Sequence, residues 1–139
     1  MFKVLLPAAI LATALAFPAQ TVSWPIVKQP HGGCAISNPD NSFRLLQRVN
    51  GKFDLSVKVP AADEMTIVFP GGDRFEHVRA AMDPNSPKKL RANDVGRAIA
   101  DELFGSKFVE INAVGFDIGP LGASRTAVAD CVASPGLTS

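Results

Sequence analysis

Two cysteines behind an apolar leader constrain this chain more than any other feature of its sequence. Residues 1–16 carry one positive charge at Lys3, a short apolar run and small residues at the end, which is typical of a cleavable secretory signal. Export would place Cys34 and Cys131, the only two cysteines, in an oxidising compartment where paired thiols normally form a disulfide. We therefore predict a Cys34–Cys131 bond that closes a loop of roughly 100 residues and stabilises the fold by about 4–5 kcal/mol.

The composition limits the class of partner. The chain has 14 Lys and Arg against 13 Asp and Glu, and loss of Lys3 with the leader would balance the two. A neutral chain has no electrostatic footprint for nucleic acid or for an anionic membrane surface. No apolar run reaches the roughly 18 residues of a membrane-spanning helix. We expect residues 17–139 to form one periplasmic or extracellular domain without a membrane span.

The clearest structural signal is a β-hairpin over residues 43–59, where two segments of alternating apolar residues flank an Asn-Gly pair. A two-residue loop would mix arginines into the apolar face, whereas a three-residue loop over 49–51 sets apolar side chains opposite one another. A slip of one residue turns every side chain to the other face, so the buried face selects the register. We predict the three-residue loop, with Phe43 opposite Val57 and Gly51 in a left-handed conformation.

The rest of the chain has the patterns of further strands and helices. Asp73 and Glu76 fit a helix cap, and Phe75 and Val78 would share one face of that helix. We expect, in chain order, an edge strand over 24–27, a strand over 65–69, a helix over 73–82, a polar loop over 84–91, a helix from 93 or 94 to 104, a strand over 108–113 and a last helix over 119–132. These elements predict an α+β domain, in which a small antiparallel β-sheet has about three helices on one face.

Two alternatives to the disulfide use the sulfur of Cys34. His31 lies three residues away and could activate a cysteine nucleophile, or His31 and Cys34 could bind zinc together with His77 and Cys131. A nucleophilic thiolate needs a free cysteine, which export disfavours. Structural zinc sites usually show two close ligand pairs, and this chain has only one. We expect no metal and no cofactor.

Two other clusters could form sites. His77 neighbours Asp73 and Glu76 and could act as a general base, although an exposed helix histidine is the simpler interpretation. Lys88, Lys89 and Arg91 form the only basic cluster. In a proline-bounded loop they could dock an acidic partner or could simply be solvated.

The segment from Phe116 to Cys131 carries the pattern F-x-I-x-x-L-x-A followed by A-x-x-x-C. Together with Trp24, the Gly-Cys-Ala around Cys34 and the hairpin, it resembles a loose group of small exported proteobacterial proteins. The group includes the invasion-associated locus B family and periplasmic accessory proteins of type VI secretion. Residues 119–122 replace the group's usual glycine before the last helix. The resemblance implies an early cysteine paired with one in that helix, and a periplasmic role without shared catalytic residues.

We therefore expect an exported, non-catalytic protein that binds a periplasmic protein partner or serves the cell envelope. Two other functions fit the sequence. An inhibitor or immunity-type protein would present the predicted loop over 84–91 to a secreted enzyme. A small hydrolase would use His77 or His31, and replacing that histidine by alanine would abolish its turnover.

Overall fold

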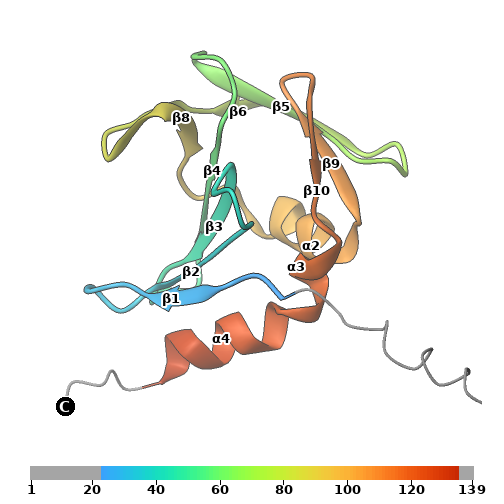
Figure 1. Ribbon diagram of the computed structural model, residues 1–139. Helices are drawn as coiled ribbons and strands as arrows, with labels where there is room; N and C mark the ends of the chain where they lie inside the picture. Colours follow the sequence, from blue (N-terminus) through green and yellow to red (C-terminus); the bar gives the residue numbers. More distant parts are fainter. Residues whose placement is uncertain (1–22, 135–139) are drawn as a thin grey trace, which may run out of the picture.

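Most of the regular secondary structure consists of strands in two antiparallel sheets, and helices pack at one end of the sheets (Figure 1). The computed structural model describes residues 23–134, so the predicted secretory signal over 1–16 lies outside the described residues. Strands and helices together confirm the predicted α+β class.

The secondary-structure elements follow one another without long loops. The large sheet contains β1 (Ile26–Lys28), β2 (Cys34–Ser37), β3 (Phe43–Gln47), β4 (Phe53–Val57), β7 (Ala81–Asp83) and β8 (Ser86–Ala92). The small sheet contains β5 (Glu64–Val68), β6 (Arg74–Arg79), β9 (Phe108–Ile111) and β10 (Val114–Asp117). The helices within residues 23–134 are α2 (Arg97–Gly105), α3 (Gly119–Ala123) and α4 (Arg125–Ala133).

The two sheets share one hydrophobic core. The strand order is β1-β2-β3-β4-β8-β7 in the large sheet and β10-β9-β5-β6 in the small sheet. Leu45 and Leu55 from the large sheet, Ile67 and Ile111 from the small sheet and Leu103 from α2 are all buried in this core. Helix α4 packs along β1 and β2 (Figure 1), and its Val128 is buried in the same core. The core therefore covers one face of the large sheet and leaves the opposite face for other contacts.

The predicted hairpin is confirmed in its register. Phe43 pairs with Val57, as expected for the three-residue loop. The Arg48 amide donates to the Lys52 carbonyl oxygen at 2.8 Å, and Gly51 has φ +88°. Only this register turns the apolar side chains of β3 and β4 toward the core, which is the physical reason that it could be deduced.

The predicted helix over 73–82 is wrong, because this segment forms β6 and β7. Val78 pairs with Met65 and Phe75 pairs with Ile67, so β6 contains one residue more than β5 between these two pairs. This β-bulge includes His77, which has φ +61°. The extra residue lets Phe75 and Val78 face the same side of a strand at a spacing of three, which resembles the spacing of a helix face.

The predicted polar loop over 84–91 is also wrong. Residues 86–92 form β8, which pairs with β4 on one side and β7 on the other. Leu90 and Ala92 face the core and are fully buried. Two prolines favoured a loop here: Pro84 lies in the turn into β8, and Pro87 is the second residue of β8. Strand β7 pairs with only part of β8.

The other predicted elements occur with shifted ends. Helix α2 begins at Arg97, later than the predicted start at 93 or 94, and it has no side-chain cap. The predicted strand over 108–113 is β9, and a tight turn at Asn112-Ala113 leads into β10, a strand that the sequence pattern does not predict. The last predicted helix is divided at Ser124 into α3 and α4.

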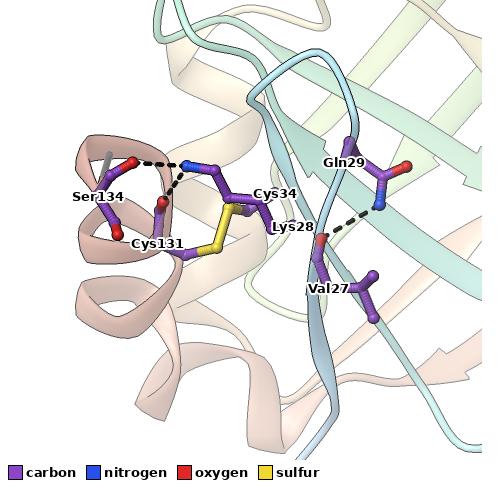
Figure 2. Close-up of a disulfide and its surroundings, with 6 residues drawn as sticks. All are labelled: Val27, Lys28, Gln29, Cys34, Cys131 and Ser134. Atoms are coloured by element: carbon purple, nitrogen blue, oxygen red, sulfur yellow. Dashed lines mark hydrogen bonds between the residues drawn. A yellow bond between two sulfur atoms is a disulfide. The ribbon is translucent and has the colours of Figure 1, made fainter. Parts of the chain in front are cut away.

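The predicted disulfide is confirmed. Cys34 in β2 bonds Cys131 in α4, with their Cα atoms 6.2 Å apart (Figure 2). Beside the bond, Lys28 Nζ donates to the carbonyl oxygens of Cys131 at 2.9 Å and Ser134 at 2.7 Å. A cation is favourable at this end of a helix, where carbonyl groups lack partners. One covalent bond and one lysine thus fasten the last helix to the first two strands.

Candidate binding face on the large sheet

The face of the large sheet that points away from the core is polar. Side chains alternate along a strand, so the residues that lie between the core residues of β3, β4 and β8 all point to this outer side. Arg44 pairs with Ser56, and Ser56 pairs with Arg91 on its other side. We call this surface the polar face; it consists of Arg44, Leu46, Asp54, Ser56, Asp83, Lys89 and Arg91.

Asp54 is the centre of a hydrogen-bond network on the polar face. Its side chain is 2% exposed and accepts two hydrogen bonds from Arg48, at 2.7 and 2.9 Å. Arg91 Nη2 donates to it at 3.2 Å and the Asp94 amide at 2.8 Å. Burial alone would raise the pKa of Asp54, but donation from Arg48, the Asp94 amide and Arg91 outweighs burial and holds that pKa below its usual value. Asp54 is therefore an ionised anchor that fixes two guanidinium groups.

These guanidinium groups border a surface hollow of about 490 Å³. The β1–β2 loop, the β3–β4 turn and the end of β8 contribute its lining, which consists of His31, Leu46, Arg48, Val49, Asn50, Asp54, Arg91 and Asn93. Val49 is 64% exposed at the hairpin tip. A second hydrogen bond also orients Arg91, because its Nε donates to Asn93 Oδ1 at 2.8 Å. The hollow thus combines ordered cations with an exposed apolar side chain.

The predicted basic cluster is divided between the two sides of β8. Lys88 is exposed, whereas Lys89 and Arg91 lie on the polar face. Lys89 is only 5% exposed. Of the three predicted residues, Arg91 alone reaches the hollow. The three side chains therefore do not form one exposed docking loop, because neighbouring residues of a strand point to opposite faces.

His77 lies elsewhere, on the bulge of edge strand β6. Its Nδ1 is 2.9 Å from Glu64 Oε1 and its Nε2 is 4.0 Å from Glu76 Oε1. The hydrogen bond to Glu64, followed by the charges of Glu64 and Glu76, raises the pKa of His77. The residues lining the adjacent hollow of about 350 Å³ are Asp63, Glu64, His77, Arg79 and Ala80, which include an acid–base pair but no hydroxyl or thiol group. His77 is exposed, as the simpler interpretation expected, although on a strand.

The cysteine alternatives fail because both sulfurs are bonded to each other. Cys34 therefore has no thiolate to pair with His31, and neither cysteine can ligate zinc together with His77. Over residues 23–134, no group of three or more His, Cys, Asp or Glu side chains is arranged to hold a metal ion. In the same part of the chain, no helix combines the length and apolar character needed to cross a membrane.

The sequence contained a partial signal for this face. In the predicted hairpin register, Arg48 and Asp54 flank the turn, so their proximity could have been inferred. The contribution of Arg91 could not, since it depends on the pairing of β4 with β8. The chain matches no family model, no curated protein and no solved structure.

Proposed function

We propose that this is an exported periplasmic protein that binds another protein of the cell envelope and has no catalytic role. The secretory leader over 1–16 supports export, and the Cys34–Cys131 bond is consistent with an oxidising compartment. The observation that carries the binding role is the pair of guanidinium groups held by Asp54 at the hollow beside Val49.

Ordered arginines next to an exposed apolar side chain are typical of protein interfaces. Arginine is enriched at interface hot spots, and a guanidinium that is already fixed loses little freedom on binding. Arg48 and Arg91 use only part of their donor capacity on Asp54, which leaves N–H groups for the carboxylates of a partner. We therefore expect a partner surface with carboxylates around an apolar centre.

The test compares two exposed valines. The mature, disulfide-bonded protein is used to capture partners from an envelope extract of the bacterium that encodes it, and each captured protein is then purified and titrated directly. Val49→Asp should weaken binding at least tenfold, because it puts a carboxylate beside the hollow. Val27→Asp is the matched control, since Val27 is 56% exposed on edge strand β1. Equal binding by both variants would refute the proposed face.

The same titration distinguishes the two other functions. An inhibitor or immunity-type protein would capture a secreted enzyme and abolish its activity at a one-to-one ratio. Its predicted contact segment, 84–91, now belongs to the β7–β8 hairpin, so Lys88→Glu at the exposed side of that hairpin would disrupt such a complex while Val49→Asp would not. A hydrolase would show turnover that disappears in His77→Ala or His31→Ala.

A further inference from the structure

Lys89 is a buried cation without a partner. Its side chain is 5% exposed, and within residues 23–134 its ammonium group forms no hydrogen bond and no ion pair. Yet no side-chain nitrogen or oxygen of the described residues is both sealed from solvent and unpartnered. The stem of Lys89 is thus covered while its ammonium still reaches solvent. This is an accessible charge that has no ion-pair partner among the described residues.

Arg44 is a second cation on the same face; it is half-buried and has no ion pair within residues 23–134. It lies in β3 opposite Ser56, whose other neighbour is Arg91, and Lys89 is two residues from Arg91 on the same side of β8. Strands β3 and β8 lie on either side of β4, so they are about 10 Å apart at a spacing of about 4.8 Å per strand. The side chains of Arg44 and Lys89 are long enough to approach one point above β4 from its two sides. Within the described residues, the one side-chain hydrogen bond of Arg44 goes to the neutral Gln29 Oε1, at 3.3 Å.

The electrostatics agree with this arrangement. Burial, followed by the positive charge of Arg44, lowers the pKa of Lys89. Burial, followed by the charge of Arg91, lowers the pKa of Arg44. The exposed Lys58 and Asp40 also act on Lys89 and offset each other in charge. Asp83 acts in the opposite direction on both groups, and Asp54 does so on Arg44. Burial is therefore the largest cause of both shifts, and repulsion between the cations adds to it.

The nearby carboxylates are already occupied. Asp54 accepts from Arg48, Arg91 and the Asp94 amide. Asp83 accepts from Ser56 Oγ at 3.3 Å and from the backbone amide of Asn85 at 2.9 Å. Its Oδ1 lies 3.9 Å from Arg91 Nη1. Four cations therefore face two carboxylates, which leaves two positive charges in excess; the groups are Arg44, Arg48, Lys89 and Arg91 against Asp54 and Asp83.

We propose that Arg44 and Lys89, with Arg91 beside them, form a site for a doubly charged oxyanion, namely a phosphate group. A planar guanidinium and an ammonium group are the side chains that most often bind phosphate oxygens. A dianion would neutralise the excess charge, whereas a single carboxylate would leave half of it. The site goes beyond the proposed function, because neither Arg44 nor Lys89 lines the hollow beside Val49.

Calorimetric titration of the mature, disulfide-bonded protein with inorganic phosphate tests the site, at constant ionic strength set with chloride. We expect saturable one-to-one binding that Lys89→Met and Arg44→Met each weaken at least tenfold, about 1.4 kcal/mol. Lys88→Met is the matched control, since Lys88 is exposed on the other side of the same strand. Lys89→Met keeps the length of the buried side-chain stem. If Lys89→Met does not fold, Arg44→Met tests the site independently.

A second arm identifies the source of the phosphate group. Phosphatidylcholine vesicles with and without phosphatidic acid are mixed with the wild type and with Lys89→Met, and bound protein is measured by sedimentation. Binding to the acidic vesicles that is lost in Lys89→Met identifies the ligand as a lipid headgroup. Binding of inorganic phosphate without binding of vesicles identifies it as a free phosphate. No binding in either arm, or equal weakening by Lys88→Met and Lys89→Met, would overturn the proposal.

Discussion

Replacing Asp54 by asparagine removes the charge that fixes Arg48 and Arg91 at the hollow. Breaking a fully buried ion pair destabilises a protein by about 3–5 kcal/mol. The side chains of Arg48 and Arg91 are 36% and 24% exposed, so water can solvate both guanidinium groups once the carboxylate is gone. The asparagine oxygen can still accept from the Asp94 amide. We therefore expect a loss of about 2 kcal/mol in the free energy of unfolding.

Urea unfolding of the oxidised protein at pH 7 measures this loss. With a slope of about 2 kcal/mol per molar urea, the midpoint of Asp54→Asn should fall by about 1 M. Asp117→Asn, which changes an exposed carboxylate in β10, is the matched control and should leave the midpoint unchanged. Equal midpoints for the wild type and Asp54→Asn would show that the network does not contribute as inferred.

The same network predicts a pH dependence. Because the pKa of Asp54 is lower in the folded protein than its ordinary 3.8, the unfolded chain takes up the proton more readily. The contribution of Asp54 is therefore complete above about pH 4 and is lost as the pH falls through the folded-state pKa. The difference between the wild type and Asp54→Asn should shrink in acid. A constant difference between pH 7 and pH 3 would contradict the assignment of the charge to Asp54.

Two smaller effects follow from the structure. Glu64→Gln should lower the pKa of His77 toward its ordinary 6.5, as read from the imidazole NMR shifts, because it removes the largest cause of the raised value; an unchanged titration would exclude the His77–Glu64 hydrogen bond in solution. Lys28→Met should lower the unfolding free energy by about 0.5–1 kcal/mol in urea, because two carbonyl groups at the end of α4 lose their cation; a wild-type midpoint would show that this contact contributes nothing.

The hairpin and the disulfide could be predicted because each depends on information that is local or unambiguous. The register of β3 and β4 follows from which side chains must be buried, and Gly51 supplies the left-handed turn residue. The cysteine pairing had only one solution once both residues were placed in an oxidising compartment. In both cases, elementary chemistry left few alternatives.

The errors arose where the deciding interactions are distant in sequence. The bulge at His77 gives Phe75 and Val78 a helix-like spacing, and only pairing with β5 shows that the segment is a strand. The β9–β10 turn uses Asn112 and Ala113, both at positive φ, so the usual glycine signal is absent. The polar face likewise depends on Arg91, which reaches Asp54 only because β8 pairs with β4.

Export of the protein must precede formation of the Cys34–Cys131 bond, and one mass measurement tests both. The protein is released from the periplasm by osmotic shock, treated with an alkylating agent without reductant and weighed intact. We expect the mass of residues 17–139 without added alkyl groups, and two additions after reduction. A chain that retains residues 1–16 would contradict export with cleavage, and alkylation of either cysteine before reduction would contradict the disulfide.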